Sequence, residues 1–587
     1  MTVPEVEAGK HIDILQANTA GFFTGASING ANTYKTTAFT ESDPAQSVTI
    51  AGSQGKGVTL NEEKNHIIYA SGIKDVDTVT LGRADFAKDA VLFDRSSTGY
   101  NYAKVKALGV DSFAVAYDKP ETVAAGDTMT LLKANKTLAD MAAQTKTNSY
   151  EYEPVTGVKV NAAVTGSLAA KGGAVTYRAE ENRAGKLTFT DVDWKDSGAL
   201  LTRPSNIVFA GADVDTAKIH FKNIESLQAK KKMTLVSDFG DSVGTITGNK
   251  YTVGTGLEGE GAASLAGSDL IFTAKTGTGN LQPQEQAHKA VMAMEAGVAM
   301  LAAGSEHAGM ALGGLAAQGN GGPDGTSTFA SVGGGASRYE TGSHVNTNTW
   351  NALVAAGGKK ETEKGTLQYG LFGEYGKGNY TLHSSAGRGD GDAHYAGGGL
   401  LARWTNKYNV YTEASFRLGR MNDTASDILH DAAGNGYGYD VHANYYGGHV
   451  GFGKVFIYKG GRSLDIYGKY FYTKRDGVNF TAGGSAYDLD SVASSVLRVG
   501  ARYGTTDRKW NWYGGLAYDY EFDGEAAGKV DGVSIRSASV KGGSVRGELG
   551  LRMDATKDNP WKADISVYGY GGKHRGFGGN VSVAYTF

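Results

Sequence analysis

One repeated pattern dominates the C-terminal part of the chain. From about Thr326 onward, apolar and polar side chains alternate along segments separated by polar, glycine-rich turns. A period of two indicates β-strands with one apolar face. The last segment, "NVSVAYTF", keeps this period up to Phe587. Because an apolar strand at a free sheet edge promotes aggregation, the pattern favours a sheet that closes on itself.

Three features favour membrane-spanning strands over those of a soluble protein. The segments reach the ~10 residues that a tilted strand needs to cross a bilayer, whereas soluble strands average about 5–6 residues. Short connections, such as 459–463 and 505–509, alternate with long ones at 421–436 and 523–540, which is typical of outer-membrane barrels. Aromatic residues gather at segment ends, as in interfacial girdles: Trp404, Tyr408, Trp510, Trp512, Tyr518, Tyr520, Phe522, Trp561, Tyr585 and Phe587. A soluble β-sandwich or lipocalin-like barrel is the alternative, because its strands also alternate.

The segments predict an all-β fold, an antiparallel transmembrane barrel of about twelve strands, an even number as in single-chain bacterial barrels. Their expected starts are Thr326, Asn346, Thr366, Ala393, Lys407, Tyr437, Ser463, Ala486, Lys509, Ser539, Trp561 and Gly578. The polar face of the segments predicts a charged lumen formed by Glu374, Glu413, Arg417, Lys469, Arg498, Arg502, Arg546, Glu548 and Arg552.

The longest helical signal lies directly before the barrel. Residues 284–315 are rich in alanine, methionine and leucine and follow Pro283, a residue favoured at helix starts. A helix of ~32 residues would be ~48 Å long, enough to thread a bilayer-spanning barrel. A barrel of about twelve strands should admit one thin helix, since eight strands leave no space and sixteen leave a channel. A linker helix outside the barrel is the alternative. The polar residues expected to face the lumen are Glu285, Lys289, Glu295, Glu306 and His307.

The order of these features resembles the translocator unit of autotransporters (type V secretion). A glycine-rich β-segment precedes a helix with "EAGVAML" and "GSE", followed by "STFASVGGGASRYETGSHVNTNTWNALVAAGG". The resemblance covers roughly 284–587 and implies that the helix occupies the pore after the upstream passenger has been exported. The final Val583, Tyr585 and Phe587 resemble the family's signal for the barrel assembly machinery, which with periplasmic chaperones is an implied partner. Some members cleave the passenger at an Asn-Asn pair in the helix; this chain has none there, so we expect the passenger to stay attached or to be cut elsewhere.

The part upstream of the helix predicts a β-rich passenger at 1–281. Short β-runs such as "SVTIAG", "HIIYASG" and "KLTFTDVD" fit a right-handed β-helix or a related solenoid, although no strict repeat period connects them. The resemblance implies a folding-promoting segment near 160–281. The predicted domains are therefore the passenger at 1–281, the pore helix and linker at 282–320, and the barrel at 321–587.

Two short motifs are candidate functional sites. "FGDSVG" is similar to the surroundings of a serine-protease nucleophile, but Ser242 would need a histidine and an acid within reach. The histidines of the passenger, His11, His66 and His220, lie in no recognisable motif, so we expect no enzymatic activity, cofactor or metal site. The expected passenger function is adhesion or surface interaction; a secreted hydrolase using Ser242 and a plugged outer-membrane channel are the alternatives.

The second motif is Arg388-Gly389-Asp390, in a segment expected to be an external loop. A tripeptide of this kind could bind a host integrin, but it also arises easily by chance in a loop rich in glycine and aspartate.

Three further features limit the possible partners and the location of the protein: its net charge, its cysteine content and its N-terminal residues. The formal net charge of −3 argues against binding to nucleic acid. The lack of cysteine excludes a disulfide scaffold and suits export through an oxidising periplasm. The start "MTVPEVEAGKHIDILQ" has no basic or apolar region of a signal peptide, so we expect the export signal to lie outside this sequence. The expected partners are outer-membrane lipid and a host or cell-surface ligand, with the barrel in the outer membrane and the passenger at the cell surface.

Overall fold

A computed structural model describes residues 6–587 except 29–32, 45–46, 97–98, 110–112, 139–140, 191, 196, 277–278, 317–324, 341–343, 537–538 and 557–558. The chain forms two compact units. The first comprises residues 1–217, 232–248 and 263–272, and the second comprises 218–231, 249–262 and 273–587.

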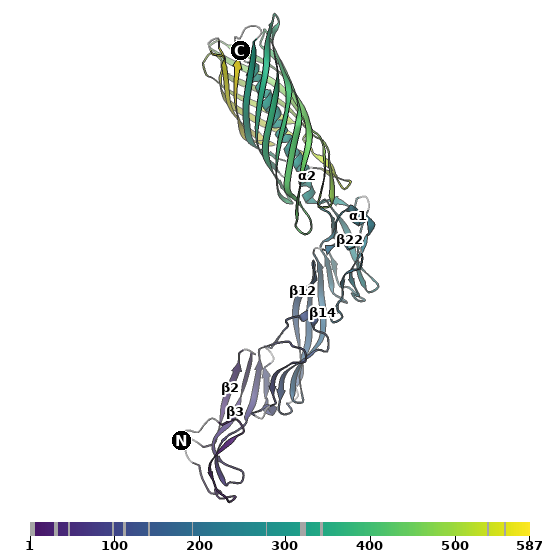
Figure 1. The fold of residues 1–587 in the computed structure, drawn as a ribbon, viewed down its shortest axis with the longest axis vertical. Helices are drawn as coiled ribbons and strands as arrows, with labels where there is room; N and C mark the ends of the chain where they lie inside the picture. Colours follow the sequence, from purple (N-terminus) through teal and green to yellow (C-terminus); the bar gives the residue numbers. More distant parts are fainter. Residues whose placement is uncertain are drawn as a thin grey trace. The chain divides into compact units, whose positions relative to one another are not determined.

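A closed barrel of twelve antiparallel strands makes up most of the second unit (Figure 1). The strands are β25 (Thr326–Glu340), β26 (His344–Thr362), β27 (Gly365–Ser384), β28 (Gly387–Asn406), β29 (Val410–His430), β30 (Gly436–Tyr458), β31 (Arg462–Arg475), β34 (Val492–Thr505), β35 (Asn511–Glu521), β38 (Gly542–Met553), β39 (Trp561–Gly572) and β40 (His574–Thr586). The last strand pairs with the first along its whole length, so no sheet edge is left open. The predicted all-β fold with a twelve-stranded barrel is confirmed.

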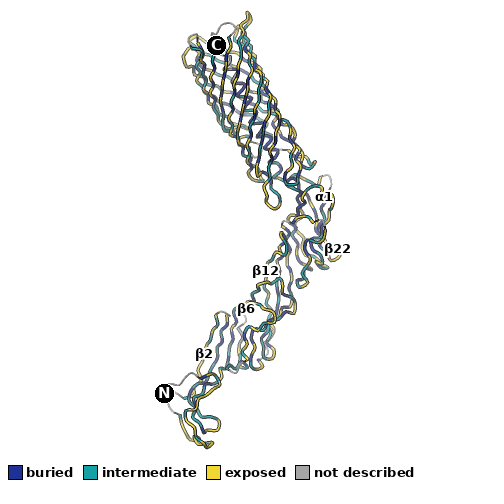
Figure 2. The backbone as a smooth tube through the Cα atoms, viewed as in Figure 1, coloured by how far each residue is buried: buried dark blue, intermediate teal, exposed yellow. Residues whose placement is uncertain are grey.

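Alternation along each strand separates the two faces of the barrel. On β29, Phe416 and Leu418 are half-exposed on the outer face, while Arg417 between them is completely buried. On β27 the outward Leu371 and the inward Phe372 show the same contrast. The backbone in Figure 2 therefore changes repeatedly between exposed and buried along the strands. Apolar side chains form the outer wall, as a lipid-facing surface requires.

Five neighbouring strands are longer than the rest. Strands β26–β30 have 19–23 residues, whereas the other strands of the barrel have 11–15. The long external connection expected at 421–436 is therefore wrong, because residues 421–430 continue β29 and only 431–435 connect it to β30. Asp, Asn and Ser residues are common in loops, but the inward positions of this segment are Met421, Asp423 and Ala425, which are all buried.

The connection expected at 523–540 contains a hairpin of β36 (Ala527–Val530) and β37 (Val533–Arg536). It joins a second hairpin, β32 (Val478–Ala482) and β33 (Ser485–Leu489), in a four-stranded sheet with the order β32-β33-β36-β37.

Helix α2 (His288–Ala316) runs inside the barrel and is preceded by the 3-10 turn η3 (Glu285–Ala287) (Figure 1). It contacts strands β25–β31, β34 and β40, which surround it. Its apolar side chains pack against inward residues of the strands, and one such cluster comprises Ala308, Leu312, Phe329, Leu353, Ala355, Phe372, Leu401 and Ala584. Among the described residues, no helix is long and apolar enough to cross a bilayer.

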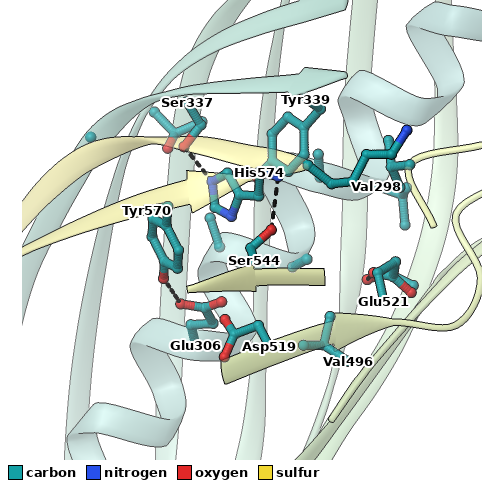
Figure 3. Close-up of a pocket in the computed structure, with 18 of the residues that line it drawn as sticks. Val298, Glu306, Ser337, Tyr339, Val496, Asp519, Glu521, Ser544, Tyr570 and His574 are labelled. Atoms are coloured by element: carbon teal, nitrogen blue, oxygen red, sulfur yellow. Dashed lines mark hydrogen bonds between the residues drawn. The ribbon is translucent and has the colours of Figure 1, made fainter. Parts of the chain in front are cut away.

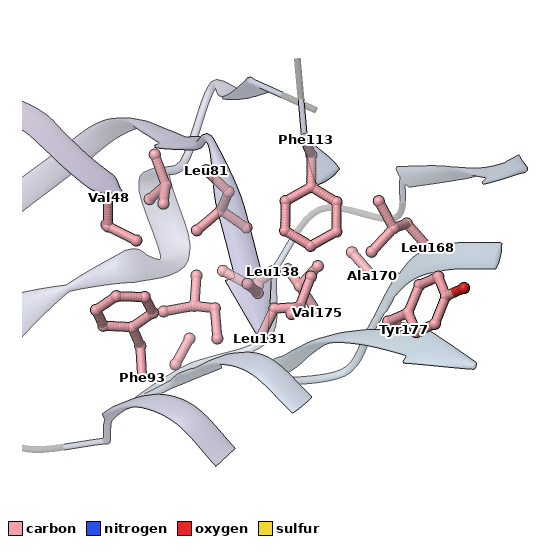
Figure 4. Packing of buried hydrophobic residues seen from close by; sticks show 14 of the residues in the cluster. Val48, Leu81, Phe93, Phe113, Leu131, Leu138, Leu168, Ala170, Val175 and Tyr177 are labelled. Atoms are coloured by element: carbon pink, nitrogen blue, oxygen red, sulfur yellow. The ribbon is translucent and has the colours of Figure 1, made fainter. Parts of the chain in front are cut away.

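The first unit consists mainly of short strands and a long meander. Its elements are β1 (His11–Gln16), β2 (Lys35–Asp43), β3 (Val48–Leu60), β4 (His66–Ser71), β5 (Lys74–Leu81), β6 (Arg83–Asp85), β7 (Val91–Arg95), β8 (Tyr100–Asn101), η1 (Tyr102–Lys104), β9 (Ala107–Gly109), β10 (Ala114–Ala116), η2 (Pro120–Thr122), β11 (Thr128–Ala134), β12 (Met141–Val155), β13 (Val158–Lys171), β14 (Ala174–Phe189), β15 (Val192–Asp193), β16 (Ala199–Thr202), β17 (Asp213–Thr216), β19 (Lys232–Ser237) and β20 (Ile246–Thr247). Figure 4 shows part of its core, in which Phe93, Phe113, Leu131 and Tyr177 pack together.

The remaining elements of the chain are β18 (Ile219–Phe221), α1 (Ile224–Ala229), β21 (Lys250–Val253), β22 (Leu257–Ala266), β23 (Asp269–Ala274) and β24 (Gln282–Pro283). Strands β18 and β21 pair in parallel, and β21, β22 and β24 pair antiparallel just before helix α2.

Candidate functional site: the lumen and its helix

The inward positions of the barrel strands build a charged lumen around helix α2. The nine residues proposed for it lie on inward faces, and six of them are buried, namely Glu374, Glu413, Arg417, Arg498, Arg546 and Glu548. The other three, Lys469, Arg502 and Arg552, line a cavity in the lumen. Opposite charges meet there: the carboxylate of Glu548 lies 2.6 Å from Arg502 and 2.5 Å from Arg546. Such pairing is required because an unpaired charge is costly away from water.

Arg417 connects the barrel wall to the backbone of the helix. Its Nε donates to Glu374 over 2.8 Å, and its Nη1 donates to the carbonyl oxygen of Leu301 on α2 over 2.6 Å. The hydroxyl of Tyr445 donates to the same carboxylate over 2.7 Å, and its ring centre lies 4.8 Å from the guanidinium. A charged side chain of the wall therefore holds a main-chain group of the helix at the centre of the barrel.

Glu306 is a second connection, this time from the helix to the wall. Its carboxylate lies 2.7 Å from Arg498 and accepts a 2.7 Å hydrogen bond from Tyr570. Arg498 also binds Asp519 through two hydrogen bonds of 2.7–2.8 Å. Figure 3 shows Glu306 between Tyr570 and Asp519. These contacts fix the rotation of the helix as well as its depth.

A cavity of about 90 Å³ lies beside Glu306, between the helix and strands of the barrel. His574 lines it; its ring stacks between those of Tyr339 and Tyr570, and its Nε2 lies 2.9 Å from the hydroxyl oxygen of Ser337 (Figure 3). The volume of this cavity is sufficient for several water molecules.

We expect the variant Glu306→Gln to loosen the helix. Glutamine keeps the shape but loses the negative charge, so the ion pair with Arg498 becomes a weaker hydrogen bond from the guanidinium to an uncharged amide oxygen. Hydrogen bonds to charged groups contribute about 1.5–3 kcal/mol. Pore openings recorded for the full-length protein in planar bilayers should become about tenfold more frequent. Glu285→Gln is the matched control, because Glu285 bonds to Ser385 before the helix begins. Openings at the wild-type rate would show that Glu306 does not anchor the helix.

A second lumen cavity of about 100 Å³ lies beside Glu306, Gly309 and Met310 of the helix. Seven cationic side chains line it against four carboxylates. The cations are Arg403, Lys469, Arg498, Arg502, Arg546, Arg552 and Lys562, and the carboxylates are Glu306, Asp465, Glu548 and Asp564. The helix therefore leaves polar free volume beside it, lined by surplus positive charge.

One buried charge cluster was missed by sequence reasoning. Arg475 lies 2.6 Å from Asp423, which also accepts a 2.7 Å hydrogen bond from Tyr380. Both charged side chains are completely buried. Gly297 of the helix faces this cluster, and a Cβ there would overlap the Arg475 guanidinium. Asp423 was missed because its segment was expected to be a loop; the alternation that continues through 421–425 is the signal that could have found it.

The other polar residues proposed for the helix have separate environments. Glu285 is not part of α2: it lies in η3 and accepts a hydrogen bond from Ser385 at the β27–β28 hairpin. Lys289 donates to the carbonyl oxygen of Arg388 over 3.3 Å. Glu295 and His307 are both buried within the barrel.

The segment entering the barrel is held at the same end. Gln286 forms two 2.8 Å hydrogen bonds with the backbone of His430, at the end of β29. Just upstream, the hydroxyl of Thr255 donates to the carbonyl oxygen of Ala482 over 2.8 Å, and the amide of Gly256 donates to the hydroxyl of Ser485 over 3.1 Å. The helix therefore begins at the end of the barrel that carries the long hairpins.

The tripeptide Arg388-Gly389-Asp390 does not lie in a loop, which corrects that expectation. It belongs to β28, where Arg388 and Asp390 project to the same side and pair with each other at 2.9 Å. Gly389 faces the other side, where a Cβ would touch Ile428. The two side chains that a receptor would need are thus engaged with one another.

Ser242 is exposed, and its hydroxyl donates to Asp241 over 3.1 Å. His66 pairs with Asp13 and His220 with Thr252, while His11 is exposed. Among the described residues, no three histidine or carboxylate side chains are grouped as a metal site would require.

The proposed assembly signal lies at the closing seam of the barrel. Val583 and Tyr585 belong to β40, and Phe587 follows its end. The amide of Phe587 donates to the carbonyl oxygen of Thr326 over 3.0 Å, next to the paired strands β25 and β40. The Phe587 side chain is exposed on the outer face, and its ring packs against Tyr585.

Comparison with known proteins matches the barrel to one family. The model of the autotransporter beta-domain matches residues 328–567, and no curated protein matches the chain. Similar solved structures include the β domain of the Bordetella autotransporter BrkA, with 14% identity and a TM-score of 0.37 over 44% of this chain and 98% of that one. The translocator domain of NalP from Neisseria meningitidis has 15% identity and a TM-score of 0.38 over 50% and 99% of the two chains. The transport unit of AIDA-I from Escherichia coli has 12% identity and a TM-score of 0.36 over 52% and 100%. Residues 328–567, which include most of the closed twelve-stranded barrel, therefore match the autotransporter beta-domain.

Proposed function

We propose that the barrel exports residues 1–281 across the outer membrane and displays them at the cell surface, with α2 remaining as the plug. An autotransporter barrel lies in the outer membrane, where short turns face the periplasm and longer hairpins face outward. The observation that carries the proposal is the direction of the helix. Its first residues bond near the long hairpins at Arg388 and His430, so residues before it leave the barrel on the outer side.

In this proposal, the passenger is a β-solenoid that presents a surface for binding a partner. Parallel pairings between segments about 30 residues apart support it, since each solenoid turn pairs with the next. Leu187 pairs with Val214, which pairs with Ile246, and His220 pairs with Thr252. A stack of such turns offers a long side surface for binding. The partner is a host or cell-surface ligand.

Protease treatment of intact cells tests this proposal. The full-length protein, expressed behind an export signal, should lose residues 1–281 while a heat-modifiable C-terminal barrel fragment survives. Cells shaved in this way should also lose adhesion to host cells, whereas unshaved cells keep it. Protection of the whole chain until the envelope is broken would contradict surface display. Unchanged adhesion after shaving would contradict the adhesin role alone.

A further inference from the structure

The five long strands form a wall, β26–β30, whose outer face changes character toward the hairpins. On β27 the outward residues pass from Leu371 and Tyr375, both exposed apolar or aromatic side chains, to Lys377 and Asn379. On β29 they pass from Leu418 directly to Arg420. On these two strands the lipid-facing band therefore ends, and the strands continue beyond it with a polar outer face.

The first polar residues beyond the band include two cations. Lys377 and Arg420 are exposed, and neither forms an ion pair with any residue that the structure describes. They occupy the positions where the headgroups of a bilayer meet its hydrocarbon, next to the aromatic side chains of Trp350 and Tyr375. Two unpaired cations at this level favour binding of an anionic headgroup, because their charge is not neutralised by a neighbouring carboxylate.

The next outward residues carry amides and carboxylates. Asn348, Asn379 and Asp392 occupy facing positions on β26, β27 and β28. Together with Trp350 and Lys377 they line a surface hollow of about 500 Å³, whose floor includes Gly335 and Gly378. Amides and carboxylates bind hydroxyl groups, and an exposed indole ring packs against the apolar face of a sugar or an acyl chain. Toward the hairpins, the outer face therefore passes from cations that suit phosphate groups to amides and a carboxylate that suit sugar hydroxyls.

We propose that the outer face of β26–β30 binds the phosphorylated sugar headgroup of an outer-leaflet glycolipid. Lys377 and Arg420 hold its phosphates, while Asn348, Asn379 and Asp392 bind sugar hydroxyls in the hollow beside Trp350. The site continues the lipid-facing band of the barrel and complements the charge of the headgroup. The inference uses the outward direction of the hairpins from the proposed function. Its test is performed on purified protein, so its failure is distinguishable from a failure of passenger export in cells.

Native mass spectrometry of the full-length protein in detergent micelles tests the proposal, with lipid A as the glycolipid. Lipid A carrying two phosphates and its dephosphorylated form should bind with dissociation constants that differ by tenfold or more, about the effect of one charge-assisted hydrogen bond. The double variant Lys377→Gln/Arg420→Gln should lose this preference and bind both forms equally. Trp350→Ala should weaken binding of both forms alike.

Lys454→Gln is the matched control, because Lys454 is exposed on the outer face of β30 near the short-turn end. It should leave the affinity unchanged, and heat-modifiable migration should verify that every variant contains a folded barrel. Equal affinity of the wild-type protein for both forms of lipid A would overturn the proposal. So would an equal loss in Lys454→Gln, since this would indicate general attraction to positive charge.

Discussion

Replacement of Arg417 by methionine should lower the free energy of unfolding of the barrel by about 3–5 kcal/mol, the range for removing one partner of a buried ion pair. The guanidinium is fully buried, and the carboxylate of Glu374, 2.8 Å away, is only 3% exposed. Without the arginine this carboxylate keeps only the hydrogen bond from Tyr445 among the contacts described above. The carbonyl oxygen of Leu301 also loses its contact with the wall. The helix should therefore leave the lumen more often, and the pore should conduct.

A double-mutant cycle separates the lost pair from lost packing. Glu374→Met should destabilise the barrel by a similar amount, because it leaves Arg417 buried without its partner. Both methionines together should restore most of the stability, since an apolar pair replaces a buried ion pair at little cost. Urea unfolding of the refolded protein in micelles provides the four free energies. A double variant as unstable as the sum of the single variants would contradict a dominant pair interaction.

Whether a contact in the lumen can be predicted from the sequence depends on how far apart in the chain its two residues lie. Alternation alone assigns Arg417 and Arg498 to the polar face of their strands, because period two is local. Which carboxylate each meets depends on the register of strands and on the depth of the helix. Glu306 and Arg498 are 192 positions apart in sequence, and no local pattern encodes their contact. Asp423, the partner of Arg475, shows the other difficulty, because the polar residues near the end of β29 have the composition of a loop.

The passenger was less predictable for a different physical reason. Its parallel pairings join Leu187 to Val214 and Val214 to Ile246, with unequal spacing. The long antiparallel meander β12–β14 separates these pairings from the earlier parallel pair of β7 and β11. Internal repeats are recognised by their equal spacing. The short β-strands could therefore be predicted from the sequence, but their parallel pairing could not.

Gly304 of the helix provides a test in which two physical effects have opposite signs. Alanine favours a helix over glycine by about 1 kcal/mol, so Gly304→Ala should stabilise an unobstructed helix. In the lumen, however, a Cβ at this position would overlap the hydroxyl of Tyr395 and lie 3.0 Å from the Arg417 guanidinium. Tyr395 has little freedom to move: it is 1% exposed, donates to Asn351 over 2.7 Å, and packs edge-on against Tyr445.

Overlap should therefore outweigh propensity, and Gly304→Ala should destabilise the seated helix by about 1–3 kcal/mol, the usual range for overpacking a buried site. Single-channel recording should detect more frequent openings, and the temperature of barrel unfolding should fall. The matched control is Ala302→Val, which adds two carbons beside the 90 Å³ cavity rather than against a wall and should leave the pore closed. If Gly304→Ala instead raised the unfolding temperature without opening the pore, helix propensity would dominate. This result would contradict the packing of the helix against Tyr395. It would also contradict the hydrogen bond from Arg417 to the carbonyl oxygen of Leu301, which requires the same position of the helix.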